Sequence, residues 1–195
     1  MLYKNVQPLG EQAIAPLWVF GYGSLMWRPG FAYERAAPAL LKGAHRALCV
    51  YSIFHRGTVD QPGLVLGLDR GGACRGVAFQ AAAGTEAATL AYLREREQVT
   101  SVYVEAHRDV KLLDGSGEAV KALTFLVDRN HVQYAGDLSL EEQLRIVADG
   151  RGESGLNAEY VLNTVRHLEE AGVHDPLLGE LVARLGRDPD VGVKG

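Results

Sequence analysis

The order of predicted strands and helices constrains the fold of this chain more than any other feature. Segments rich in Val, Phe, Tyr and Ile, separated by Gly, Pro and Asp turns, recur through the first half and favour β structure. The strands so predicted are 17–21, 46–54, 63–68 and 75–80. Residues 31–41 fit either a short helix or an irregular crossover, and the sequence does not choose between them.

The middle of the chain predicts one helix and a hairpin. A helix is expected from Thr85, as its N-cap, to about Gln98. Two strands follow at 102–113 and 119–127, joined by the tight turn Asp-Gly-Ser-Gly at 114–117, whose residues tolerate positive φ.

The last part of the chain is helical. Ser139 with Glu142 resembles a capping box that opens a helix over 140–148. Helices at 156–171 and 177–185 and a frayed tail at 187–195 are also expected. Strands first and helices afterwards predict an α+β fold rather than a doubly wound sheet, because parallel crossovers need a helix after nearly every strand.

Composition and charge exclude several classes of protein. With 195 residues, 47% of them hydrophobic, the chain predicts a single domain over 1–195 with its core at about 17–185. The net charge of -4 comes from interspersed acids and bases, so nucleic acid is not an expected partner. No stretch approaches the ~20 apolar residues that cross a bilayer. Cys49 and Cys74 lie outside any disulfide pattern, so we expect free thiols and a cytoplasmic protein. We also expect a monomer.

Three familiar motifs fail on inspection. Residues 21–26 (GYGSLM) begin like a dinucleotide fingerprint, but Met26 occupies the third glycine position. Neither Ser24 nor Ser154 lies in GxSxG. The six histidines form no HExxH and no pair at ligand spacing near the cysteines. We therefore expect neither a metal site nor a cofactor.

The same glycines fit another chemistry. The apolar run 18–20 leads into GYGSL, which describes a buried strand that breaks into a glycine turn. Such a turn can point successive backbone N–H groups into a concavity and hold a carboxylate, and glycine lets the ligand approach the main chain. Taken alone, these residues are more often a simple strand-end turn.

Further blocks make the pattern specific. Residues 18–29 (WVFGYGSLMWRP) look like the FGYGSL signature of the ChaC family. Similar blocks follow in the family's order: His55-Arg56-Gly57-Thr58 with Pro62-Gly63, Gly71-Gly72 with Cys74 and Gly76, Tyr92-Leu93 with Arg96-Glu97 and Tyr103, Tyr134-Ala135-Gly136, and residues 154–160 (SGLNAEY). The chain thus resembles the ChaC-like glutathione-specific γ-glutamylcyclotransferases over nearly its whole length.

This resemblance implies a γ-glutamylcyclotransferase-like mixed β-barrel with peripheral helices, and an enzyme that cleaves glutathione into 5-oxoproline and Cys-Gly without a cofactor. It implies that the γ-glutamyl group is bound by the strand end and turn, namely Val19, Phe20, Gly21, Tyr22, Gly23, Ser24 and Leu25. Arg56 and Tyr134 are further candidates, although Arg56 fits a structural pair as well. Asn157, Glu159 and Tyr160 either touch substrate or pack and cap a helix.

Two acids, Glu95 and Glu97, compete for the catalytic role that the resemblance gives to the Glu of an Arg-Glu pair. The spacing to Tyr103 matches the family only for Glu97. Independently, at ~100° per residue Glu97 falls between Leu90 and Leu93 on the helix surface, whereas Glu95 points elsewhere. We expect Glu97 to face the interior and to be catalytic; the alternative is a surface carboxylate paired with a neighbouring arginine.

The expected chemistry needs no nucleophile from the protein, because the α-amine and the γ-carbonyl belong to one substrate molecule. One carboxylate can take a proton from the ammonium as a general base and return one to the departing nitrogen as an acid, and apolar neighbours should raise its pKa. Two alternatives stay open: a cyclotransferase for other γ-glutamyl amino acids or amines, and a non-catalytic protein that binds a γ-glutamyl metabolite.

Overall fold

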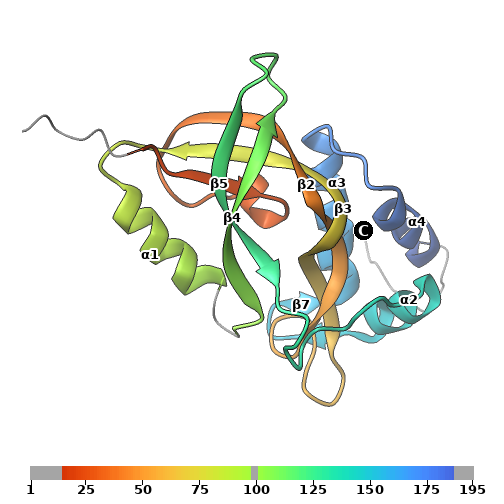
Figure 1. Cartoon of the computed structure of the whole chain (residues 1–195). Helices are drawn as coiled ribbons and strands as arrows, with labels where there is room; N and C mark the ends of the chain where they lie inside the picture. Colours follow the sequence, from red (N-terminus) through yellow and green to blue (C-terminus); the bar gives the residue numbers. More distant parts are fainter. Residues whose placement is uncertain (1–14, 98–100, 187–195) are drawn as a thin grey trace, which may run out of the picture.

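The computed structural model describes residues 15–97 and 101–186. Within these residues, strands form a closed barrel in the order β1-β3-β2-β4-β5 (Figure 1). Neighbouring strands are antiparallel except β1 and β5, whose parallel pairing closes the ring. The strands are β1 (Trp18–Gly21), β2 (Tyr33–Ser52), β3 (Gly63–Ala81), β4 (Tyr103–Leu112) and β5 (Ala119–Val127). The predicted α+β class and mixed β-barrel are confirmed.

The first half of β2 contradicts one expectation. Residues 31–41 form neither a helix nor an irregular crossover, because β2 already begins at Tyr33. Ala37, Ala39 and Leu41 are buried, and the residues between them are not, which is the period of two typical of a strand with one face on the core. The alanines of this segment also suit a helix, so their burial in the barrel decides the conformation.

The strands predicted at 63–68 and 75–80 are also one continuous strand, β3. Gly71 and Gly72 adopt φ values of 98° and 65°, and the pairing with β2 shifts register between Lys42 and Ala44 opposite them. Glycines at a shift of this kind let a ladder bend through a bulge. The glycines at 71–72, which suggested a turn between two strands, therefore bend one continuous strand.

Helices cover the barrel from outside. They are α1 (Glu86–Glu97), α2 (Leu140–Asp149), α3 (Asn157–Glu170) and α4 (Pro176–Leu185), with a two-residue hairpin of β6 (Arg151–Gly152) and β7 (Gly155–Leu156) before α3. The predicted capping box of α2 is confirmed: the Glu142 N–H donates to the Ser139 hydroxyl, and the Ser139 N–H donates to the Glu142 carboxylate. Thr85, the expected N-cap, directly precedes α1, and its hydroxyl donates to the Ala82 carbonyl. Gln98 and the tail at 187–195 lie outside the described residues.

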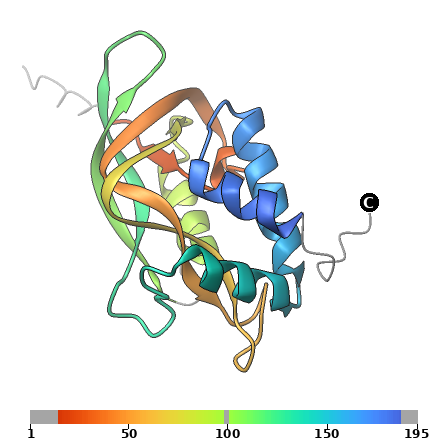
Figure 2. The same cartoon turned by 90° about the vertical axis from the view of Figure 1, so that its right-hand side faces the viewer.

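The barrel separates α1 from the other helices. In Figure 1, α1 lies on one side of the strands and α2, α3 and α4 lie on the other, and Figure 2 shows those three grouped together. Leu93 fixes α1 by packing, fully buried, in a cluster with Val19, Leu25, Leu123 and Phe125. No helix in the described ranges combines the length and apolar character needed to cross a membrane. The packing of Leu93 against Val19 and Leu25 brings the last turn of α1 next to the turn that follows β1.

Candidate active site

The chain makes a tight glycine turn at the end of β1. A Cβ at Gly21 would lie 3.0 Å from the Leu25 Cβ and 3.2 Å from the Leu25 carbonyl carbon, so the turn closes around a glycine there. The 3₁₀ helix η1 (Ser24–Met26) follows, and the Met26 N–H donates to the Gly23 carbonyl over 2.9 Å. At Gly23, a Cβ would meet only the Leu66 Cδ1, at 3.6 Å. Gly23 thus borders open space.

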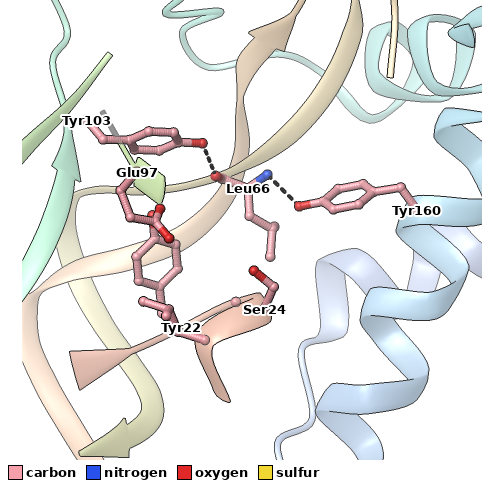
Figure 3. Close-up of a pocket in the computed structure, with 8 residues that line it drawn as sticks. Tyr22, Ser24, Leu66, Glu97, Tyr103 and Tyr160 are labelled. Atoms are coloured by element: carbon pink, nitrogen blue, oxygen red, sulfur yellow. Dashed lines mark hydrogen bonds between the residues drawn. The ribbon is translucent and has the colours of Figure 1, made fainter. Parts of the chain in front are cut away.

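That space is a small cavity of about 100 Å³. The glycine turn with η1 forms one wall, and β3, α1, β4 and α3 each contribute one further residue. The lining residues are Tyr22, Gly23, Ser24, Leu25, Leu66, Glu97, Tyr103 and Tyr160 (Figure 3). The structure therefore brings together Tyr22, Gly23, Ser24 and Leu25 of the predicted binding set with the predicted catalytic Glu97.

Two tyrosines hold the main chain of β3 at this cavity. The Tyr103 hydroxyl donates to the Leu66 carbonyl over 2.7 Å, and the Leu66 N–H donates to the Tyr160 hydroxyl over 3.1 Å. Figure 3 shows the two rings reaching Leu66 from opposite sides. Burial raises the pKa of Tyr22, Tyr103 and Tyr160, so all three phenols are neutral at physiological pH.

Glu97 is the carboxylate of this cavity. It is the last residue of α1, and its side chain is 17% exposed. Burial raises the pKa of Glu97 above its usual value, and the nearby Arg96 guanidinium, with Nε 3.2 Å from Oε1, opposes part of that rise. Glu95 is exposed on another side of the helix. The predicted orientation of the two acids is confirmed, while the catalytic role of Glu97 stays a prediction.

Arg96 joins α1 to the glycine turn. Besides its ion pair with Glu97, it donates to the Ser24 hydroxyl over 2.8 Å, the Arg28 carbonyl over 2.7 Å and the Tyr92 hydroxyl over 2.8 Å. The carboxylate and the turn are therefore held relative to each other by one side chain. The sequence offered Arg96 only as a marker of the Arg-Glu pair, because its partners lie up to 72 positions away.

A larger cavity of about 560 Å³ meets the small one at Glu97 and Tyr103, which line both. Its walls are mostly apolar and come from the end of β2, the loop after it, and β3. The apolar residues are Val50, Ile53, Phe54, Val59 and Val65, and Arg96 also lines this cavity. The carboxylate thus lines both a small cavity and a larger, mostly apolar one.

Other predicted binding residues lie outside both cavities. Val19 and Phe20 are fully buried in the core, and Gly21 packs against Leu25. Their packing supports the turn from the core. None of the three is among the residues that line the small cavity, so their contact with substrate stays a prediction.

Arg56 and Tyr134 are likewise absent from the linings of the two cavities. Arg56 donates to the carbonyls of Ser154 and Leu156 and lies 5.6 Å from the centre of the Tyr160 ring. The Tyr134 hydroxyl donates to Asp69 over 2.8 Å. Both contacts are of the structural kind that the sequence left open for Arg56.

Residues of α3 divide between packing and the cavity. The Asn157 side-chain amide forms two hydrogen bonds of 2.7 Å with the Leu64 main chain and so attaches α3 to β3. Tyr160 lines the small cavity. Leu66 was not singled out from the sequence, since nothing distinguishes it from its apolar neighbours in β3. Across the described residues, no three His, Cys, Asp or Glu side chains are grouped as a metal site would require.

Comparison with known proteins gives one consistent family. Residues 17–187 match the family model described as ChaC-like protein. The chain is 35% identical to a glutathione-specific gamma-glutamylcyclotransferase of Escherichia coli (strain K12), over 86% of this chain and 71% of that protein. It is 33% identical to glutathione-specific gamma-glutamylcyclotransferase 1 of Homo sapiens, over 87% and 78%. A crystal structure of the gamma-glutamyl cyclotransferase specific to glutathione from yeast shares its fold, with a TM-score of 0.77 at 22% identity over 89% of this chain and 99% of that one.

Proposed function

Because this chain belongs to the ChaC-like protein family, we propose that it is a γ-glutamylcyclotransferase that cleaves glutathione into 5-oxoproline and Cys-Gly. The observation that carries the proposal is the position of Glu97. This partly buried carboxylate has a raised pKa and lines both the small cavity beside the glycine turn and the larger apolar cavity. A group of this kind suits proton transfer near neutral pH.

In the proposed complex, the γ-glutamyl half of glutathione lies in the small cavity. Its α-carboxylate meets the main chain at Gly23 and the hydroxyl of Ser24, since a glycine turn can present N–H donors to an anion without a side chain in the way. The Cys-Gly half extends into the larger cavity. The scissile amide then lies near Glu97 and Tyr103, where the two cavities meet.

The proposed reaction is an intramolecular transfer of the γ-acyl group. Glu97 takes a proton from the α-ammonium, and the freed amine attacks the γ-carbonyl to close a five-membered ring. The bond from the γ-carbon to the cysteine nitrogen then breaks, and Glu97 returns a proton to that nitrogen. The α-nitrogen loses two protons in all and the released amine gains two, so the overall reaction consumes none. The neutral phenol of Tyr22, which lines the same cavity, is the candidate donor to the oxyanion.

The proposal is tested by incubating the purified chain with reduced glutathione and quantifying 5-oxoproline and Cys-Gly by mass spectrometry. Equal amounts of both products are expected. N-acetyl-glutathione should be inert, because its α-nitrogen cannot attack as an amine. γ-Glutamyl-alanine is the matched comparison for the leaving half: efficient turnover of it with none of glutathione would reject the glutathione assignment and favour a cyclotransferase of other γ-glutamyl compounds.

The proposal extends to the setting of the enzyme. We propose one catalytic domain with its core at about 17–185, acting as a monomer in the cytoplasm without nucleic acid. The free, buried thiols of Cys49 and Cys74 and the net charge of -4 support this part. Light scattering coupled to size exclusion measures the molar mass, and a dimer would contradict the monomer.

A further inference from the structure

One charged side chain is buried behind the glycine turn. Arg46 belongs to β2, and its side chain is only 4% exposed. Its Nε donates to the Tyr22 carbonyl over 2.6 Å, and its Nη2 donates to the Arg75 carbonyl in β3 over 2.7 Å. A buried guanidinium is costly unless its charge and its donors are satisfied. Here one of the groups that satisfies it is the main chain of the proposed binding turn.

Arg46 lies outside both cavities that share Glu97. It borders a separate cavity of about 290 Å³ formed by β2, β3 and the connection between α3 and α4, and no residue of that lining belongs to the proposed active site. Arg46 therefore contacts the turn from a side that is not the substrate's. Any effect of Arg46 on the reaction is therefore indirect, through the main-chain carbonyls that it binds.

We propose that Arg46 is a positioning residue that orients the Tyr22–Gly23 peptide for binding of the γ-glutamyl carboxylate, an inference that rests on the proposed function. The C=O and N–H of a trans peptide point in opposite directions, and the described peptides are trans. Holding the Tyr22 carbonyl on Arg46 therefore turns the Gly23 N–H away from Arg46. The charge on Arg46 also polarises this peptide, which makes its N–H a stronger donor to an anion.

Asp175 connects the same arginine to the C-terminal helices. Its Oδ2 lies 3.5 Å from the Arg46 Nη1, and its Oδ1 accepts the Leu178 N–H as the N-cap of α4. The carboxylate balances the buried charge and limits where the guanidinium can move. The turn is thus tied to α4 through two side chains, although α4 contributes nothing to either cavity of the proposed site.

Arg46→Lys tests this role because it keeps the charge but loses the planar fork, so one ammonium cannot serve both carbonyls and Asp175. We expect the KM for glutathione and the Kd for 5-oxoproline to rise about tenfold or more, as for a lost charge-assisted hydrogen bond. The kcat should stay within about threefold, because Arg46 does not touch Glu97. Arg46→Met should show the same split more strongly.

Two further variants make the result decisive. Arg75→Gln changes an exposed side chain while keeping the carbonyl that Arg46 binds, so KM and Kd should not change. Asp175→Asn still caps α4 but removes the charge facing Arg46, and it should raise KM about two- to fivefold. This variant decides the question if neither Arg46 variant folds.

If the role of Arg46 were purely structural, replacing it would lower the melting temperature of the protein. The KM and Kd measured below that temperature would then stay unchanged. The inference is overturned if the folded Arg46 variants bind glutathione and 5-oxoproline as wild type does. If neither Arg46 variant folds, the same result for Asp175→Asn overturns it. A wild-type protein that makes no 5-oxoproline from glutathione would instead reject the proposed function. The two failures are therefore separable.

Discussion

Replacing Glu97 by Gln should remove most of the turnover while leaving binding and folding intact. The amide keeps the shape of the carboxylate in the cavity wall but can neither take the proton of the α-ammonium nor return one to the departing nitrogen. General acid–base catalysis contributes about 10²–10⁴-fold, and because one carboxylate serves both transfers we expect a loss near the upper end of that range. The Kd for 5-oxoproline should change little.

The same substitution has a defined sign for stability. Burial raises the pKa of Glu97, and Arg96 offsets only part of that rise. The folded protein thus holds this proton more tightly than the unfolded chain, so the contribution of Glu97 to the free energy of unfolding falls as pH rises through its folded pKa. At about pH 7 to 8, Glu97→Gln should be at least as stable as wild type, and the difference should vanish below about pH 4, where both side chains are neutral.

Rates of 5-oxoproline formation, thermal unfolding at two pH values and calorimetric binding of 5-oxoproline check these expectations together. The matched control is Glu95→Gln, which changes an exposed acid two residues earlier in α1 and should leave the rate within a few-fold of wild type. An inactive Glu95→Gln with an active Glu97→Gln would show that the register is wrong by two residues. Full activity in both would refute the single-carboxylate mechanism.

Three other substitutions or treatments probe the turn, the pH dependence and the thiols. Gly23→Val should fold, because a Cβ there meets only Leu66 at 3.6 Å, yet calorimetry should show no binding of 5-oxoproline; normal binding would place the anion site elsewhere. Arg96→Gln removes the charge that lowers the pKa of Glu97, so the acidic limb of the kcat/KM profile should move to higher pH, and an unmoved limb contradicts the pairing. Iodoacetamide at about pH 8 should not inactivate the folded enzyme, because Cys49 and Cys74 are buried and burial raises the pKa of Cys49 to about 12; rapid inactivation would show an accessible thiol.

Features set by neighbours along the chain could be predicted from the sequence. The capping box of α2 lies within four consecutive residues, and the strand predicted at 119–127, after the turn at 114–117, matches β5. The orientation of Glu97 followed from the helical period, because Leu93 anchors the same face of α1. These signals depend on one or two turns of local backbone and need no knowledge of the tertiary fold.

Features set by distant partners could not be predicted. The glycines at 71–72 suit both a turn and a bulge, and only the pairing of β3 with β2 makes them a bulge. Leu66 enters the cavity wall through hydrogen bonds to Tyr103 and Tyr160, which are 37 and 94 positions away. Arg46 contacts Tyr22 across 24 positions, and in the sequence it is one arginine among others. The wall of the site therefore had to be read from the structure.

The proposed function depends most on the identity of the nucleophile, which is the substrate's own amine and not water. The measurement that tests this directly is turnover of reduced glutathione by the wild-type protein in H₂¹⁸O, with the products analysed by mass spectrometry. We predict 5-oxoproline that contains no ¹⁸O, formed in equal amount with Cys-Gly, because ring closure uses no water. Glutamate carrying ¹⁸O in its γ-carboxylate would show that water attacks the γ-carbonyl and would contradict the cyclotransferase mechanism.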